Sequence, residues 1–432
     1  MKNKRQRRRV RTQYLITAGL GLAVTLIFII QAVFPSINDD DTSSTVSTSQ
    51  NDVGITPEPT SRIAPTPESG TPQITVLDPH INSTGLFQFF QPGDDWYLER
   101  DDYNTDYRRA STVYISPSRL SVIHAFLEIG TNYTTLQAVS DELFTDVYFN
   151  TEWGQYKTWR YTNREVANGL ITIEFALEDD RNELLKYIAR QISWLEGNWL
   201  YTIRIVVPDN NPVLLDHLFE LTSPTMIGYH NIAAFPLLGW TEFSDPSQRM
   251  MIKLQEVWTQ VSGSSGRPIT YRGATLTEGY EVTIQRIPGQ PLVSLEAAQE
   301  WLSTFREGIQ IIEGRPTDQT FAQGYWFSYT YSTVEGDPVS AAASLLNDTD
   351  GNLYVAELRA PERDVNFLAA DLTEQRLIGQ QIIQSFTVLA PFGYSIVPGT
   401  AGQPVQPSEA PTQDAATPEA DATAETTAPF GG

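Results

Sequence analysis

Histidines are the side chains best suited to acid–base or metal chemistry, and in this chain they are few and scattered. No two have a metal-site spacing such as His-Glu-x-x-His; they are His80, His124, His217 and His230. The chain contains no cysteine, which excludes thiolate ligands, cysteine nucleophiles and disulfides. We interpret the histidines as packing or surface residues. The sequence therefore predicts no metal site and no cofactor.

The acidic residues and serines give no better catalytic pattern. Adjacent carboxylates such as Asp101-Asp102 suit acid–base hydrolysis in principle, but in a chain with 52 acidic residues such pairs arise by chance. No serine stands in the Gly-x-Ser-x-Gly pattern of a hydrolase nucleophile. The segment Asn347–Gly351 resembles part of a calcium loop, but that alignment puts Leu346 at the first ligand position. We expect a hairpin turn there, and we predict no catalytic residue.

An alternating run of aromatic residues is the most suggestive feature for binding. Residues two apart share one face of a strand, which groups Tyr325, Phe327, Tyr329 and Tyr331. On an exposed face such rings stack on sugars or grip a peptide. The alternative is a core face packed beneath a helix, and we favour that alternative. These four residues are the candidate ligand-binding aromatics of the sequence.

The N-terminal region predicts a membrane anchor. Residues 15–34 form an uncharged apolar run of 20 residues, long enough to cross a hydrocarbon core of about 30 Å. The basic residues of the tail 1–14 precede this run, so the tail is expected to stay in the cytoplasm. A cleavable signal peptide is the alternative, but its apolar region would be shorter. We expect an uncleaved single-pass helix with the rest of the chain outside the cell.

Two polar segments flank the part of the chain that can form a core. Residues 35–80 are rich in Ser, Thr, Pro and Asp and read as a disordered stalk, and residues 392–432 read as a disordered acidic tail. The formal net charge is -23 although the N-terminus is strongly basic. Nucleic-acid binding needs a basic surface, so we expect no nucleic-acid partner.

The region between these segments carries an approximate internal repeat. Similar patterns recur in the same order, at an offset that drifts from 159 (Leu136 to Leu295) to 153 (Pro208 to Pro361). The matched pairs are helical patterns at 136–143 and 295–302, strands at 169–173 and 324–329, strands at 199–208 and 353–361, and helical patterns at 212–221 and 367–386. One irregular domain with chance matches is the alternative.

The repeat predicts an α+β fold of two tandem similar domains. We place the first domain at residues 81–228 and the second at 229–391, each an antiparallel sheet with packed helices. Alternation along the strand at 199–208 puts Trp199 and Tyr201 on one side and Thr202 and Arg204 on the other. That pattern indicates a sheet with one buried face.

Two short motifs resemble the Mog1/PsbP-like superfamily of α/β/α sandwiches. Leu86–Trp96 is an aromatic strand that runs into a Pro-Gly-x-x-Trp turn, and Gln381–Val388 is similar to the final helix of that family, which ends in Ser-Phe. The chain departs from the family pattern at Phe235–Trp240, where the second half opens, and at Leu218–Pro224, where the first half ends. Known members are mostly non-enzymatic binding or assembly factors. The resemblance implies binding rather than catalysis, and it transfers no site residue.

These observations predict a non-catalytic, membrane-anchored extracytoplasmic module that binds a protein or a cell-wall ligand. A contiguous exposed apolar or aromatic patch is expected for such a module. Two alternatives stay open. A cell-wall hydrolase would need a cleft with two facing carboxylates or a nucleophile–base pair, and a purely structural surface protein would have neither cleft nor patch.

Overall fold

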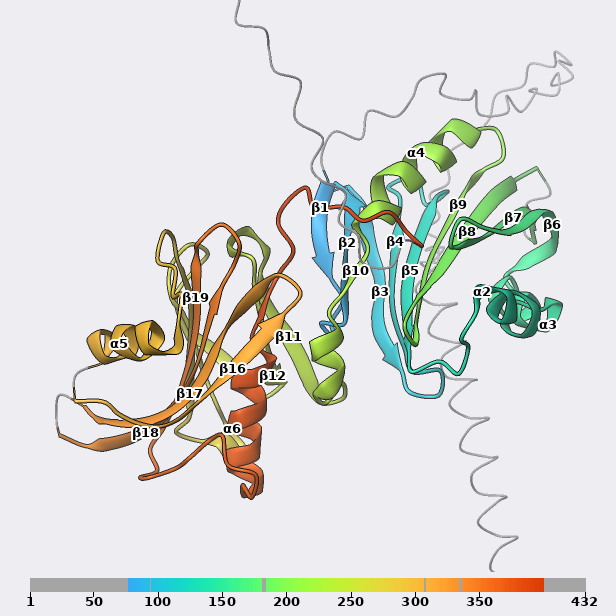
Figure 1. Ribbon diagram of the computed structural model, residues 1–432. Coiled ribbons are helices and arrows are strands. Elements are labelled where there is room, and N and C mark those ends of the chain that lie inside the picture. Colours follow the sequence, from blue (N-terminus) through green and yellow to red (C-terminus); the bar gives the residue numbers. More distant parts are fainter. Residues whose placement is uncertain (1–76, 94, 181–183, 307, 334–335, 400–432) are drawn as a thin grey trace, which may run out of the picture. The chain divides into compact units, whose positions relative to one another are not determined.

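Two antiparallel sheets of seven strands organise the computed structural model, which describes residues 77–399 except 94, 181–183, 307, 334 and 335 (Figure 1). The first sheet has the spatial order β3 (Tyr97–Asn104), β4 (Arg109–Ile115), β5 (Val122–Ile129), β9 (Trp199–Pro208), β8 (Lys186–Glu196), β7 (Leu170–Asp179), β6 (Tyr156–Ala167). The second has the order β13 (Thr259–Ser262), β14 (Ile269–Arg272), β15 (Glu281–Ile287), β19 (Leu353–Ala360), β18 (Pro338–Asn347), β17 (Ala322–Ser332), β16 (Gln310–Gln319).

Each large sheet has a small three-stranded partner built from the first and last strands of its half. The first small sheet consists of β1 (Leu77–Ile81), β2 (Phe87–Pro92) and β10 (Ile227–Gly228). The second consists of β11 (Trp240–Asp245), β12 (Met250–Gln255) and β20 (Thr387–Val388). The two halves therefore share one strand order throughout. The predicted pair of similar α+β domains is confirmed, although strands outweigh helices in both.

Helices cover both faces of each large sheet. One face is covered by α4 (Pro212–Thr222) in the first half and by α6 (Glu374–Ser385) in the second. The opposite faces carry α2 (Leu136–Ala138), its π-helical continuation and α3 (Asp146–Glu152) in the first half, and α5 (Leu295–Phe305) in the second. Local signals start these helices, because the Ser294 side chain caps α5 and Pro212 follows the cap Asn211 at the start of α4.

The expectation that the sheet has one buried face is wrong, because both faces of the central strand β9 are buried. Trp199 and Tyr201 pack with Leu218 of α4, while Leu200, on the other face, packs with Phe149 of α3. Every residue of β9 except the last is buried. The alternation of residue types is real, but the more polar face is also covered by helices, as in sheets that are packed on both sides.

The helix predicted at 367–386 begins only at Glu374. Before it, the chain crosses the sheet as a loop in which Asp364 has a positive φ of 56°. The backbone N–H groups of Val365 and Phe367 donate to the side chains of Ser340 and Ser328, at 3.0 Å and 2.9 Å. These long-range bonds satisfy the backbone of the loop, so it does not need helical bonds.

The opening of the second half also differs from the sequence expectation. Its first strand starts at Trp240, and Phe235 precedes that strand in a connection. The counterpart of the aromatic strand and turn at Leu86–Trp96 is Met250–Trp258, which ends at a buried tryptophan with 2% exposure. The match is hidden in the sequence because methionine, isoleucine and lysine replace the three phenylalanines of β2.

Several sequence predictions concern residues that the structure does not describe. The predicted tail 1–14 and span 15–34 lie outside the described residues, as do most of the stalk 35–80 and of the acidic tail. The described chain begins inside the predicted stalk with β1, and it ends at Gly399 inside the predicted C-terminal tail. Among the described residues, no helix is both long enough and apolar enough to span a membrane.

A buried lysine joins the two halves. Lys253 of β12 has no exposed surface, and its Nζ donates to the carbonyl of Thr84 at 2.7 Å. Its cross-strand neighbour is Glu242, whose backbone N–H donates to the carbonyl of Ser83 at 3.2 Å. Burial lowers the pKa of Lys253 to about 8 and raises the pKa of Glu242 to about 7. Both shifts reflect the loss of water around charged groups at this junction.

Replacing Glu242 with glutamine is expected to remove a pH dependence of stability. The folded pKa lies near 7 and the ordinary value is 4.5. Between these values the folded state holds a proton that the unfolded chain has lost, so the unfolding free energy falls as pH rises. Across that window, the wild type should lose roughly 3 kcal/mol relative to Glu242→Gln in urea denaturation. If the difference in unfolding free energy between the two proteins stays the same across this pH range, the raised pKa of Glu242 is contradicted.

Candidate ligand-binding site

Strand β17 places the predicted aromatic residues on one face, as the period-two pattern requires: Tyr325, Phe327, Tyr329 and Tyr331. Phe327 and Tyr329 have no exposed surface and lie beneath α5 with Leu302, while the other two rings are half-buried beside them. The Tyr329 hydroxyl donates to Glu357 at 2.6 Å. At the centre of this run the rings therefore form the core face that the sequence offered as the alternative to a binding platform.

His80 and His124 are tied into local contacts. The buried His124 has its Nε2 2.8 Å from the Ser111 hydroxyl, and burial lowers its pKa well below the ordinary value, so the ring is neutral. His80 contacts Asp101 at 3.1 Å and the Tyr114 hydroxyl at 2.9 Å. Within the described ranges, no group of three or more His, Asp or Glu side chains is arranged to hold a metal ion.

The segment Asn347–Gly351 forms the predicted hairpin turn between β18 and β19. The Asp348 carboxylate accepts from the backbone N–H groups of Asp350 and Asn352, at 3.0 Å and 2.9 Å, and it pairs with Arg249 at 2.9 Å. These bonds occupy the carboxylate within the turn, so its role is to shape the hairpin.

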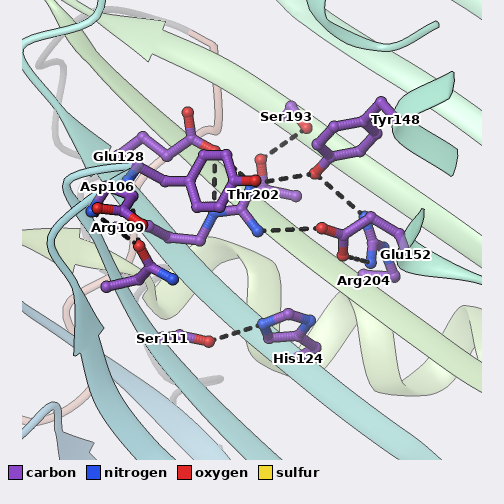
Figure 2. Close-up of polar contacts among 12 residues, drawn as sticks. Asp106, Arg109, Ser111, His124, Glu128, Tyr148, Glu152, Ser193, Thr202 and Arg204 are labelled. Atoms are coloured by element: carbon purple, nitrogen blue, oxygen red, sulfur yellow. Dashed lines mark hydrogen bonds and ion pairs between the residues drawn. The ribbon is translucent and has the colours of Figure 1, made fainter. Parts of the chain in front are cut away.

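Figure 2 shows a network of charged side chains beneath α3. Arg109 of β4 pairs with Glu128 at 2.6 Å and with Glu152 at 3.1 Å. Arg204 of β9 pairs with the second oxygen of Glu152, also at 2.6 Å. Both guanidinium groups also donate to the Tyr148 hydroxyl at 3.4 Å. Two positive and two negative charges balance inside this network.

The network fixes α3 on the sheet rather than leaving a reactive group. Burial alone would raise the pKa of Glu152, but the charges of Arg204 and Arg109 outweigh it and lower that pKa to about 2. Arg204 is only 4% exposed and Glu152 only 17%, so each charge depends on its partner. The ionised carboxylate clamps two strands of the sheet to the last turn of α3.

Replacing Glu152 with glutamine is expected to destabilise the protein by about 3 kcal/mol at neutral pH, because two buried arginines lose their shared partner. The wild type should itself lose stability as pH falls from the ordinary glutamate pKa of 4.5 towards 2, and the variant should lose less over the same range because it lacks the Glu152 carboxylate. Guanidinium denaturation at neutral and acid pH measures both effects. Glu142→Gln, at an exposed residue before α3, is the matched control. An equal effect of the two substitutions would contradict the clamp.

An open groove of about 370 Å³ runs along α6 and is the candidate ligand-binding site. Its walls come from the connection before β11, from the end of β16, from β17 and from the outer side of α6. The lining residues are Asn231, Ala234, Phe235, Thr317, Asp318, Gln319, Trp326, Leu377, Gln380, Gln381 and Gln384. Asp318 is the one formally charged residue among them.

Helical periodicity explains the α6 wall of this groove. Leu377, Gln380, Gln381 and Gln384 are three or four residues apart and so share one side of the helix. The neighbouring stripe, with Ile378 and Ile382, is buried in the core. The same helix therefore closes the core on one side and presents carboxamides to the groove on the other.

Three of the groove's amides hold its walls in place. Gln319 donates to the carbonyl of Phe386 at 2.7 Å, and Asn231 donates to the Thr387 hydroxyl at 2.8 Å. Gln380 donates to the carbonyl of Phe367 at 2.7 Å. The walls on either side of α6 are thus fixed by hydrogen bonds before any ligand arrives.

The remaining polar groups of the groove are open to a ligand. The side chains of Gln381 and Gln384 make no hydrogen bond to another described residue. A carboxamide both donates and accepts, so these side chains suit a ligand with hydroxyl or amide groups. Trp326 stands half-buried in the same groove and supplies a ring surface. The groove is chemically matched to an uncharged polar ligand.

Sequence reasoning did not find this groove. It followed the odd-numbered residues of β17, whereas Trp326 lies on the opposite face of that strand. The carboxamide stripe was visible as Gln380, Gln381 and Gln384 inside a predicted helix. No local pattern shows that this stripe meets Trp326.

Comparisons with known proteins bear on the fold. No protein-family model and no curated protein matches the chain. Among solved structures it is similar to PsbP (CyanoP) from Synechocystis sp. PCC 6803, with 17% identity and a TM-score of 0.25 over 35% of this chain and 92% of that one. The weak PsbP-like resemblance expected from the sequence thus also appears among solved structures.

Two other solved structures show weak similarity to this chain. The immunity protein TplEi of Pseudomonas aeruginosa is 14% identical, with a TM-score of 0.20 over 73% of this chain and 98% of that one. The Pseudomonas aeruginosa MucA/MucB complex contains a chain that is 10% identical, with a TM-score of 0.12 over 68% of this chain and 92% of that one. At these identities the comparisons concern the fold alone.

Proposed function

We propose that this protein is a non-catalytic, membrane-anchored module outside the cell that binds an uncharged saccharide segment of the cell wall along α6. The observation that carries the proposal is the groove, in which Trp326 and two carboxamides without partners among the described residues line a space of about 370 Å³. That volume lies near the lower end of the roughly 300–1,000 Å³ typical of small-ligand sites.

The chemistry of the groove favours a sugar over a charged ligand. A sugar ring has an apolar face that stacks on an indole, and its hydroxyls pair with groups that both donate and accept. Asp318 adds an exposed acceptor for such hydroxyls. A ligand with several charges would find only this single carboxylate as an ionic partner.

The N-terminal part of the chain would place the groove near the cell wall. An anchor at residues 15–34 would hold the protein at the membrane, and the stalk would separate the folded part from it. A flexible segment of this length spans roughly 35–40 Å as a random coil. The groove would then lie within reach of wall polymers while the protein stays attached to the cell.

Saccharide binding is tested with the detergent-solubilised full chain and chitotetraose, a neutral oligosaccharide that bears hydroxyl and amide groups. Calorimetry should show binding, and the paired change Gln381→Ala and Gln384→Ala should weaken it by about tenfold or more through lost hydrogen bonds. Gln375→Ala, on the same helix outside the groove, should bind like the wild type. An absence of binding, or equal binding by all variants, would rule out this ligand class in the groove.

Membrane attachment through residues 15–34 is tested by removing residues 1–34. The full chain should sediment with membranes and be accessible to protease added outside intact cells. The shortened chain should remain soluble, because no other segment of the sequence is apolar for that length. Recovery of the shortened chain with membranes would contradict this anchor.

A further inference from the structure

A second, smaller pocket is lined by other residues than the α6 groove. Its volume is about 90 Å³, and three aromatic side chains line it: Trp194 at the end of β8, Phe321 between β16 and β17, and Tyr394 in the segment after β20. No residue of the α6 groove contributes to it. The pocket can therefore be altered without replacing a residue of the proposed saccharide site.

The aromatic rings of the pocket are held in fixed positions. Trp194 is nearly parallel to Tyr201, with ring centroids 5.1 Å apart and planes 7° apart. Phe321 and Tyr394 meet edge to face at 5.0 Å. The segment that carries Tyr394 is held by the N–H of Ile396, which donates to the carbonyl of Pro224 at 2.7 Å. The rings need little reorganisation to receive a ligand.

One carboxylate gives the pocket its charge. Glu196 lines the pocket, and no lysine or arginine does. The pKa of Glu196 is lowered, mainly by His230, whose Nε2 lies 3.6 Å from the carboxylate. Glu196 is therefore ionised at neutral pH. The imidazole of His230, which also lines the pocket, is stacked on Trp199 with ring centroids 4.0 Å apart.

We propose that this pocket binds an organic ammonium group. Aromatic rings attract a cation to their faces, and recognition of alkylated ammonium groups by such rings is a common use of this interaction. Glu196 supplies the opposite charge. The pocket is large enough for one ammonium headgroup but small for a complete ligand of ordinary size.

Other ligand classes fit this lining less well. A hard metal ion such as calcium needs six to eight oxygen ligands, and the lining offers a single carboxylate. An anion would face Glu196 without any compensating cation. A neutral apolar group would take water away from an ionised carboxylate without replacing that interaction, which costs free energy.

The experiment titrates the detergent-solubilised full chain with tetramethylammonium chloride, followed by ligand-observed NMR. Neopentyl alcohol, a neutral molecule of similar shape, is the matched ligand control, and Nα-acetyl-lysine amide represents a primary ammonium on a side chain. We expect tetramethylammonium to bind about tenfold more tightly than neopentyl alcohol, as cation–π attraction and one carboxylate would give. If tetramethylammonium binds more tightly than Nα-acetyl-lysine amide, the natural ligand group is a quaternary ammonium. If the lysine derivative binds more tightly, it is a primary ammonium.

Three variants decide whether the binding occurs in this pocket. Glu196→Gln should remove most of the preference for the cation over the neutral molecule, and Phe321→Leu should weaken the cation by several fold while keeping an apolar side chain. Glu178→Gln, at an exposed position of β7 outside the pocket, should leave both affinities unchanged. Thermal unfolding of each variant verifies that it is folded.

The proposal is overturned by equal affinity for tetramethylammonium and neopentyl alcohol, by an absence of cation binding, or by a Glu196→Gln variant that keeps the full preference. Failure of chitotetraose to bind the α6 groove would leave this result unaffected, because the two sites share no residue.

Discussion

Each seven-stranded sheet has two faces that must both be kept from water, and the rest of the structure depends on that constraint. The central strands β9 and β19 are buried almost from end to end. One layer of helix on one side would leave half of that surface exposed. Both halves therefore send a helix across each face, with α4 or α6 on one side and α2–α3 or α5 on the other.

The layer beneath α3 and α5 contains charge in both halves. In the first half Glu152 on α3 is shared by two arginines of the sheet. In the second half Glu357 on β19 pairs with Arg306, the residue that ends α5, and accepts from Tyr329. The shared carboxylate belongs to the helix in the first half, where it is Glu152, and to the sheet in the second half, where it is Glu357. A buried charge is tolerated only with its partner in place, so each pair fixes where its helix ends.

The candidate binding groove exists because helix α6, which covers one face of the second sheet, also has a side that faces away from the core. Because α6 closes the core with one stripe of residues, its adjacent stripe must lie beside the sheet edge and the connection that leads into β11. The first half has the same helix position in α4, but there Asp216 pairs with Arg190 of the sheet. The two similar halves thus have equivalent helix faces, and their side chains give them different chemistry.

The sequence by itself determined the elements whose signals are local. Apolar alternation marks β9, and caps such as Ser294 mark the start of α5, because propensity and periodicity act over a few neighbouring residues. The local sequence pattern did not reveal that both faces of β9 are covered. It also did not reveal that Ser328 and Ser340 bind the backbone of the loop before α6, which is therefore not helical. Trp326 and Gln381 lie far apart in the chain, and only the packing of α6 on the sheet brings them into one groove. Tertiary structure decided the binding surface because a pattern shows which residues share a face, but not what covers that face.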